Sequence, residues 1–134
     1  MEDVARFGDL VGDKNPLHAC MTRDDASDFP TLQHAGLIKI QDDKSEALVH
    51  GMLASSLFSC IFGTLIPGAV YRSQDLQFRA PIYANDLVVG RIQVKQVKIA
   101  RGLLVSCDTS VTCKERTCVS GEATVWLPEG TKPK

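Results

Sequence analysis

The chain has almost no net charge. Its 134 residues include 15 Lys and Arg against 16 Asp and Glu, and 44% of all residues are hydrophobic. An excess of basic residues is the electrostatic signature of a nucleic-acid or acidic-membrane partner, so the composition suggests neither. The length predicts a single domain over residues 1–134, because a chain of this size buries about two-thirds of its extended surface on folding.

A secretory signal pattern is also missing. The N-terminal stretch MEDVARFGDL has acidic residues where a signal peptide would have a basic start and an apolar run. The five cysteines are odd in number, which does not suit a complete disulfide framework. Cys113 and Cys118 flank a predicted hairpin tip, and without a second ligand pair we interpret them as small hydrophobic side chains rather than a disulfide or half a metal site. We expect a reducing intracellular compartment, cytoplasmic or mitochondrial.

No Asp, Glu, Lys or Arg occurs from Ala47 to Tyr71. An uncharged run of about 18 residues or more is the usual indication of a transmembrane helix. Here His50 and three serines interrupt the run, Pro67-Gly68 ends it, and no basic flank sets an orientation. We therefore expect no membrane span, and predict a helix of about 16 residues that is apolar on nearly every face and covered by a sheet.

The remaining segments supply that sheet and a short first helix. Val4, Phe7, Leu10 and Val11 have helical spacing within residues 3–12. Residues 19–48 are predicted to form an irregular, variable loop region. Four stretches rich in β-branched residues are predicted as strands: 69–79, 87–99, 103–114 and 117–127, with turn signals that include Arg101-Gly102 and Glu115-Arg116. One helix followed by four strands in short connections predicts an α+β fold, an antiparallel sheet curled around the helix.

Residues 12–18, GDKNPLH, contain the first candidate chemistry. Asn15 precedes a proline and is biased toward an extended conformation, so Asp13 and His18 are expected on either side of a fixed turn. An acid and an imidazole held this way can share one water, which favours acid/base catalysis. Alone, Asp13 would be a turn or cap residue and His18 a surface histidine. Their occurrence together with a His-Gly-Met helix start at position 50 favours the catalytic interpretation.

Five motifs occur in the order seen in one known family. They are GDKNPLH at 12–18, VHGMLASSLFS at 49–59, IPG at 66–68, QDLQFRAP at 74–81 and GEATVWLP at 121–128. With these motifs the chain resembles the MaoC-like, (R)-specific enoyl-thioester hydratases, also called hydratase 2. The resemblance implies a hot-dog fold, a hydro-lyase of fatty-acid metabolism, a homodimer, and a substrate carried on coenzyme A or acyl carrier protein.

The same resemblance implies roles for five residues. Asp13 and His18 would share a water and transfer its protons as a trans-2-enoyl thioester is reversibly hydrated to an (R)-3-hydroxyacyl thioester. The N–H of Gly51, at the start of the long helix, would stabilise the enolate, since helix N-termini favour negative charge. Asn15 would orient the loop and the water, and Ser59 would position the reacting groups. No metal or redox cofactor is required, because the difficult species is an enolate that needs charge stabilisation.

Two features depart from the family pattern. The sequence reaches its first helix without a preceding strand, so we expect a sheet that lacks its first strand or has an open edge. His18 and His50 are 32 positions apart, which is longer than the family's usual connection. Two alternatives stay open: a hydrolase of acyl thioesters, since other hot-dog proteins catalyse that reaction, and a non-catalytic module that binds acyl thioesters or a protein, which the missing strand and the long connection make conceivable.

Overall fold

The computed structural model describes residues 2–20 and 44–130, together with positions 22, 25, 27, 28, 35, 40 and 41. Its elements in chain order are α1 (Glu2–Val11), the 3₁₀ turn η1 (Pro16–His18), β1 (Ile40–Gln41), β2 (Lys44–Ser45), α4 (Gly51–Leu65), β3 (Val70–Gln74), β4 (Gln77–Phe78), β5 (Val89–Ile99), β6 (Gly102–Cys113) and β7 (Arg116–Pro128).

The chain divides into two compact units. The first comprises Met1–Leu53 with Pro81–Asp86, and the second Ala54–Ala80 with Leu87–Lys134. The single domain expected over residues 1–134 stays a prediction.

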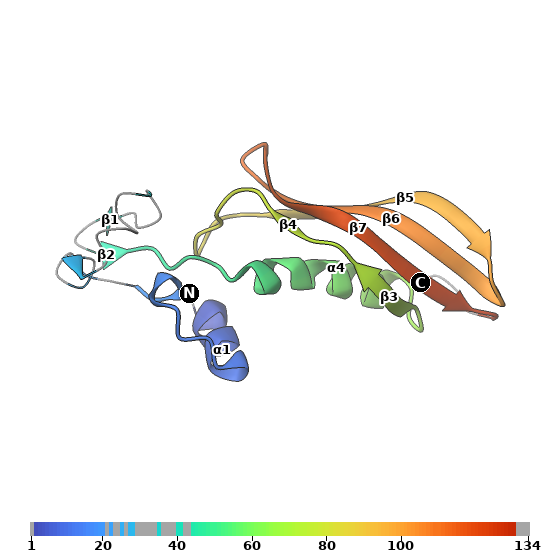
Figure 1. Ribbon diagram of the computed structural model, residues 1–134, viewed down its shortest axis with the longest axis horizontal. Coiled ribbons are helices and arrows are strands. Elements are labelled where there is room, and N and C mark those ends of the chain that lie inside the picture. The colour runs from blue at the N-terminus through green and yellow to red at the C-terminus, as the bar shows by residue number, and fades with distance from the viewer. Residues whose placement is uncertain are drawn as a thin grey trace. The chain divides into compact units, whose positions relative to one another are not determined.

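A five-stranded antiparallel sheet dominates the second unit (Figure 1). Its strand order is β3-β7-β6-β5, and β4 also pairs with β7. The long β6 pairs with β5 over almost its whole length and with β7 from Gly102↔Pro128 to Cys113↔Arg116. Lys114 and Glu115, both with positive φ (50° and 65°), form the tight turn between β6 and β7. This turn was predicted one residue later.

The outer strand β5 borders the sheet and has no further strand partner among the described residues. Several of its apolar side chains are exposed: Val89, Val94, Val97 and Ile99. An edge strand with exposed apolar residues is a surface on which another strand can pair. Within the described residues the sheet therefore has an open edge at β5, and the expectation that a first strand is missing stays a prediction.

One side of α4 packs against this sheet. The buried residues of the helix are Ala54, Ser55, Phe58 and Phe62, whose spacing places them on one face. Phe62 forms a buried cluster with residues of β6 and β7: Val105, Cys107, Ala123 and Val125. Other apolar residues of the helix are exposed, including Leu65 near its end. The helix thus begins and ends where predicted, but only one face of it is buried.

The strand predicted at 69–79 is interrupted. Both β3 and β4 pair with β7, and the break between them falls at Asp75 and Leu76. At this point a Cβ on Gly121 would lie 1.8 Å from the Asp75 carbonyl oxygen, and the Asp75 N–H donates to the Glu122 carbonyl at 2.8 Å. Only a glycine permits this approach of two backbones.

The first unit is held by α1 and by a pairing between two extended segments. Val4 of α1 is buried with Ala47 and Ala84. The Ala84 N–H donates to the Ala47 carbonyl at 2.8 Å, and the Val49 N–H donates to the Ile82 carbonyl at 2.7 Å. Further along α1, Leu10 is exposed although its helical spacing suggested burial.

Three other expectations concern the whole chain. All five cysteines are free: Cys107, Cys113 and Cys118 are buried, while Cys20 and Cys60 are exposed. Within the described residues, no helix has the length and apolar character needed to cross a membrane. Of the predicted variable loop, 19–48, the structure describes the two ends, 19–20 and 44–48, and positions 22, 25, 27, 28, 35, 40 and 41, which include the short antiparallel pair of β1 and β2.

Candidate active site

The end of α1 places Asp13. Gly12 has a φ of +75°, the left-handed conformation that commonly ends a helix. The Asp13 N–H then donates to the Gly8 carbonyl at 3.0 Å. Oδ1 of Asp13 accepts a hydrogen bond from the Asn15 N–H at 2.9 Å. The side chain is therefore tied down through one carboxylate oxygen, and Oδ2 is available for chemistry.

Asn15 shapes the turn that follows. Its backbone is extended (φ −59°, ψ 123°), as expected before Pro16, and its Oδ1 accepts from the Leu17 N–H at 3.1 Å. This side chain caps the 3₁₀ turn η1, which carries His18. Asn15 therefore contacts both arms of the loop, through its backbone to Asp13 and through its amide to η1.

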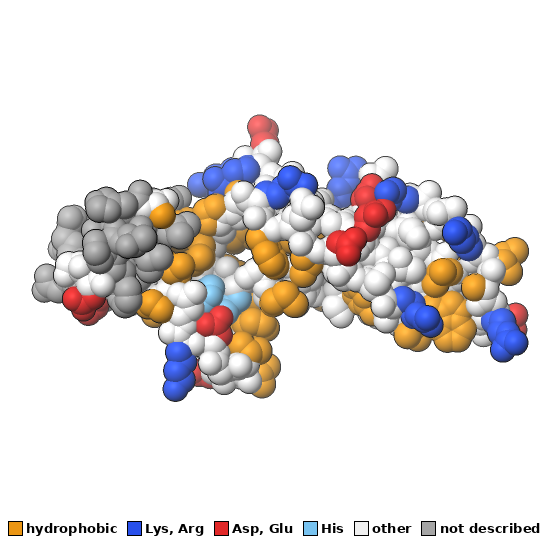
Figure 2. Space-filling view, viewed as in Figure 1, with side chains coloured by type: hydrophobic (Ala, Val, Ile, Leu, Met, Phe, Trp, Pro, Cys, Tyr) orange, Lys and Arg blue, Asp and Glu red, His pale blue; other side chains and the backbone are white. Residues whose placement is uncertain are grey.

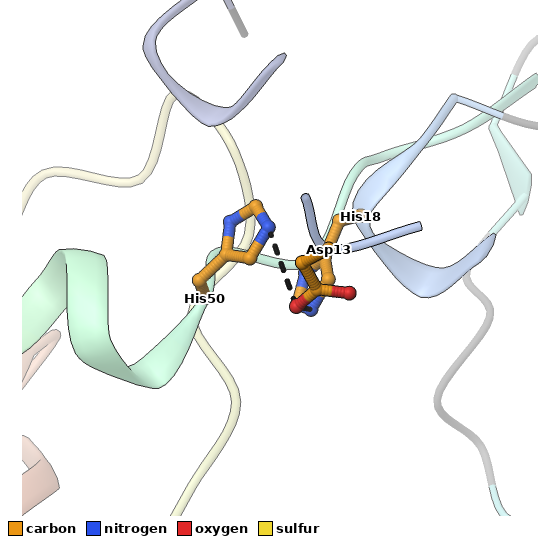
Figure 3. A group of neighbouring side chains, drawn as sticks. All are labelled: Asp13, His18 and His50. Carbon is orange, nitrogen blue, oxygen red and sulfur yellow. Dashed lines mark ion pairs between the residues drawn. The ribbon is translucent and has the colours of Figure 1, made fainter. Parts of the chain in front are cut away.

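His18 is fixed by the segment before α4. Its Nδ1 donates to the Leu48 carbonyl at 2.6 Å, and the Leu48 N–H donates to the Leu17 carbonyl at 2.8 Å. Because a carbonyl can only accept, the proton of a neutral His18 is on Nδ1, and Nε2 presents a lone pair. That Nε2 lies 3.5 Å from Asp13 Oδ2 (Figure 3).

A second imidazole faces the same carboxylate. His50 Nε2 lies 3.7 Å from Asp13 Oδ2, and the His50 side chain is only 4% exposed. Its ring stacks on that of His18, with centroids 3.6 Å apart and planes inclined by 17°, and the Phe7 ring contacts it edge-on at 5.0 Å. Burial lowers the pKa of His50 below its usual value, the neighbouring His18 lowers it further, and Asp13 opposes both. His50 is therefore neutral near pH 7.

These groups open on a cavity. It has a volume of about 430 Å³ and is lined by α1, by the loop from Asp13 to Cys20, and by His50. Figure 2 shows histidine side chains, in pale blue, beside an acidic side chain, in red, at the molecular surface. The volume falls within the range of small-molecule sites.

The arrangement suits proton transfer to and from a water. An ionised Asp13 and the Nε2 lone pair of a neutral His18 are both acceptors, so a water between them can donate a hydrogen bond to each. The pair can then take one proton from that water and later return a proton to another atom. This is general acid–base catalysis with two groups on one side of a cavity.

The same three side chains also have the composition of a metal site. One oxygen of Asp13 and one nitrogen each of His18 and His50 lie within 4.8 Å of one another. However, the two rings are nearly parallel at 3.6 Å. A cation about 2.1 Å from a nitrogen of each ring could not lie close to both ring planes, as ligation by two histidines requires. The geometry fits acid–base chemistry better than metal binding.

Known proteins are similar to this chain in sequence. A mitochondrial 3-hydroxyacyl-[acyl-carrier-protein] dehydratase of Arabidopsis thaliana is 34% identical, with 95% of this chain and 69% of the relative aligned. An (R)-specific enoyl-CoA hydratase of Aeromonas caviae is 31% identical, with 94% of this chain and 84% of the relative aligned. The chain belongs to the family of (R)-specific enoyl-CoA hydratases and 3-hydroxyacyl-thioester dehydratases. No protein-family model matches it.

Solved structures of this hydratase family show the same fold. An A. caviae (R)-hydratase involved in PHA biosynthesis superimposes with a TM-score of 0.72 at 28% identity, over 95% of this chain and 86% of that one. The R-hydratase PhaJ1 of Pseudomonas aeruginosa also gives 0.72, at 27% identity, over 99% and 77% of the two chains. The predicted family and the predicted hot-dog fold are therefore confirmed.

The structure brings some of the predicted site residues together. Asp13, His18 and Asn15 lie in one loop, and Gly51 is the first residue of α4, directly after His50. Ser59 is exposed and lies two helical turns further along α4, in the second unit. The roles of all five in a hydratase reaction stay predictions.

Sequence reasoning gave His50 no place in the chemistry. His50 served only as an argument against a membrane span and as part of the helix start, although a histidine inside a long charge-free apolar run is a signal in itself. A buried histidine is costly unless its neighbours suit it. Its neighbours, Phe7 and Gly8 on α1 and His18 on η1, come from segments more than thirty positions earlier in the sequence, so local pattern could not reveal them.

Proposed function

We propose that this protein catalyses the reversible addition of water to trans-2-enoyl thioesters, which gives (R)-3-hydroxyacyl thioesters. The observation that carries the proposal is the meeting of Asp13 Oδ2 and His18 Nε2 at 3.5 Å on the wall of a cavity. Membership in a family of hydratases and dehydratases supports it. Fatty-acid metabolism is the setting in which such thioesters occur.

In the hydration direction, a water is held between Asp13 and His18. The pair takes one of its protons while the remaining hydroxyl bonds to the β-carbon. The electrons of the double bond then move onto the thioester, which becomes an enolate. A proton from the pair goes to the α-carbon, and the thioester carbonyl forms again. Water is thus added across the double bond, and the catalytic groups return to their initial state.

Stabilisation of the enolate is assigned to the start of α4. Gly51 is the first residue of this helix, where backbone N–H groups and the positive end of the helix dipole favour negative charge. A glycine at this position lets a thioester oxygen approach the main chain. One such donor typically contributes about 3 kcal/mol to transition-state stabilisation. Ser59 is assigned a positioning role on the same helix, and Asn15 the role of orienting the loop and the water.

The test is hydration of crotonyl-CoA by purified protein, followed by loss of the conjugated-enoyl absorbance. Product configuration is assigned with a chirality-specific dehydrogenase. We expect turnover to the R product, and a loss of about 10²- to 10⁴-fold in Asp13→Asn and in His18→Ala. Asp3→Asn, which removes an exposed carboxylate in the first turn of α1, is the matched control and should keep full activity.

Three other outcomes would contradict the proposal. Release of free thiol from an acyl thioester would indicate a hydrolase. Tight binding of an acyl thioester without turnover would indicate a binding module. Unimpaired turnover in Asp13→Asn would remove the assigned base. Parallel assays with longer enoyl chains and with carrier-protein thioesters identify the carrier, coenzyme A or acyl carrier protein, and the preferred chain length.

We also propose a homodimer in which two sheets pair edge to edge. The support is the open edge strand β5 with its exposed valines, and the exposed Val70 on β3 at the opposite border of the sheet. Light scattering after size exclusion should give twice the chain mass. A charge placed on the interface strand should give a monomer, so Val97→Glu on β5 and Val70→Glu on β3 identify which edge is used. A wild-type monomer would contradict the proposal.

We place the protein in a reducing intracellular compartment, the cytoplasm or the mitochondrial matrix. Five free cysteines, two of them exposed, support a reducing environment, and two relatives from plants have mitochondrial names. Fractionation of cells that express the tagged full-length protein would test this. Recovery in a secreted fraction would contradict it.

A further inference from the structure

We infer that His50 is a positioning residue of this site, whose Nε2–H points at Asp13 Oδ2 and whose ring face supports the ring of His18. The inference rests on the proposed function for its kinetic consequences, but its geometric part can be tested without turnover. It gives a role to a buried histidine that the proton transfer between Asp13 and His18 does not itself require.

The first support is the environment of the His50 nitrogens. The side chain is 4% exposed, and neither Nδ1 nor Nε2 has a hydrogen-bond partner within the described part of the chain. Buried polar atoms without partners are rare and costly, and they commonly mark a functional requirement. An oxygen of the Asp13 carboxylate lies 3.7 Å from Nε2.

The second support is the proton that a neutral His50 must carry. On Nε2 this proton faces a carboxylate oxygen, which attracts it. On Nδ1 it would leave the Nε2 lone pair facing the same negative oxygen. Electrostatics therefore selects the Nε2–H form. The 3.7 Å separation is longer than a hydrogen bond, and contacts of this kind often shorten only when the substrate binds.

The two imidazoles thus have opposite tautomers and different tasks. His18 holds its proton on Nδ1 toward the Leu48 carbonyl and presents a lone pair at Nε2. His50 presents a donor at Nε2 to the same Asp13 oxygen. When His18 takes up a proton during the reaction, it becomes a cation stacked at 3.6 Å on a neutral ring, which avoids the repulsion that two charged rings would have.

The ring of His50 is clamped on its other sides. Phe7 contacts it edge-on, and Gly8 approaches so closely that a Cβ there would lie 3.4 Å from His50 Nε2 and 3.3 Å from the Asp13 carbonyl oxygen. A residue fixed by packing on one side and directed at a reactive carboxylate on the other is suited to holding that carboxylate in place.

The decisive experiment is ¹⁵N NMR of the histidine rings at neutral pH in the unmodified protein. The chain has three histidines, so assignment needs few variants. We expect His18 as the Nδ1–H tautomer and His50 as the Nε2–H tautomer. A His50 with its proton on Nδ1, or a charged His50, would overturn the inference whether or not the protein turns over enoyl thioesters.

Steady-state kinetics test whether removal of the His50 donor lowers turnover. His50→Phe keeps a ring against His18 but removes the donor, and we expect kcat to fall about 10- to 100-fold, the size of a lost hydrogen bond to a charged group. KM should change less than about threefold. His50→Gln places an N–H near the former Nε2 and should recover at least about fivefold of the loss. Ala84→Gly, in the core of the same unit, is the matched control for lost stability and should keep its kcat.

Rescue by the glutamine separates positioning from simple packing. A phenylalanine ring resembles the histidine ring in shape more closely than a glutamine side chain does, so a packing role predicts a higher kcat in His50→Phe than in His50→Gln, whereas a donor role predicts the reverse. Equal kcat in both variants, or a higher kcat in His50→Phe, would overturn the inference. If the wild type hydrates no enoyl thioester, the proposed function is wrong. The inference about His50 is then tested only by the histidine tautomers that NMR reports.

Discussion

The two compact units of this protein are built in different ways. The second unit contains the long strand pairs of β5, β6 and β7 and a buried cluster around Phe62. The first has a small core of Val4, Ala47 and Ala84, and its loops are held mainly by individual hydrogen bonds from backbone and side chains. Asp13, His18 and His50 all belong to the first unit.

Because of this difference, we expect the second unit to contribute mainly to stability and the first mainly to catalysis. A regular sheet over a helix gives many cooperative contacts but few free polar groups, because its backbone is paired within the ladder. A loop such as Gly12 to His18 can direct a carboxylate and an imidazole at each other, since its backbone is not committed to a ladder. We therefore expect substitutions in the second unit to act mainly on the free energy of unfolding, and substitutions near Asp13 mainly on turnover.

The strongest test of this separation is Phe58→Ala, paired with Asp13→Asn. Phe58 of α4 is completely buried, and its truncation should lower the free energy of unfolding by about 3–5 kcal/mol. Asp13 is 37% exposed and its replacement should change that free energy by less than about 0.5 kcal/mol. Urea unfolding measures both. A large destabilisation by Asp13→Asn would show that the site also supports the fold.

A second substitution in the second unit, this time in the sheet, is Gly121→Ala. The added Cβ would lie 1.8 Å from the Asp75 carbonyl oxygen, so the backbone of β7 or of the β3–β4 break must move. We expect a loss of about 3 kcal/mol in the free energy of unfolding, the upper part of the range for overpacked sites. Thermal unfolding measures it, and an unchanged melting temperature would mean that the two backbones separate at little cost.

The Gly121 contact also shows where sequence reasoning reaches its limit. Alternation of side chains is local, and it located the sheet and the turn near Lys114 to within about a residue. It could not show that one strand would split, because the cause is a backbone approach from β7. The charge-free run located α4 for the same local reason, but which of its faces is buried depends on partners elsewhere in the chain.

The same limit holds for the site: local patterns predict local structure but not contacts between distant segments. A short motif was enough to predict that Asp13 and His18 lie on either side of a fixed turn, because Asn15-Pro16 restricts the backbone locally. The stacking of His50 on His18 depends on the meeting of α1, η1 and the start of α4. No spacing in the sequence encodes that meeting.

A third, smaller effect is expected from pH. The folded state holds His50 with a lowered pKa, chiefly because of burial, whereas the unfolded chain binds a proton at the usual value near 6.5. The unfolded state therefore takes up more protons as the pH falls. The contribution of His50 to stability is full above pH 6.5 and is lost below it, with a slope of at most about 1.4 kcal/mol per pH unit.

The comparison with His50→Phe isolates this contribution from those of other groups. Unfolding free energies of both proteins, measured by urea from pH 7.5 downward, should decline more steeply for the wild type just below pH 6.5. Parallel curves would mean that His50 titrates alike in the folded and unfolded states, and would contradict its burial as a neutral ring.

The smallest effects are expected from two helix glycines, one in each unit. Among the described residues, and apart from its own helix backbone, a Cβ on Gly63 of α4 meets nothing within 4 Å, whereas one on Gly8 of α1 meets Asp13 and His50 at 3.3–3.4 Å. Alanine favours a helix over glycine by up to about 1 kcal/mol. Gly63→Ala should therefore raise the melting temperature and leave turnover unchanged.

Gly8→Ala should give less stabilisation, because its neighbours must move by a few tenths of an ångström. The same movement displaces the groups that transfer protons. We expect a several-fold loss of kcat/KM in Gly8→Ala, since catalytic geometry is sensitive to displacements smaller than 1 Å. Equal kinetics in the two alanine variants would show that the site adjusts to its packing, and the separation between a stabilising unit and a catalytic unit would then be weaker than the structure indicates.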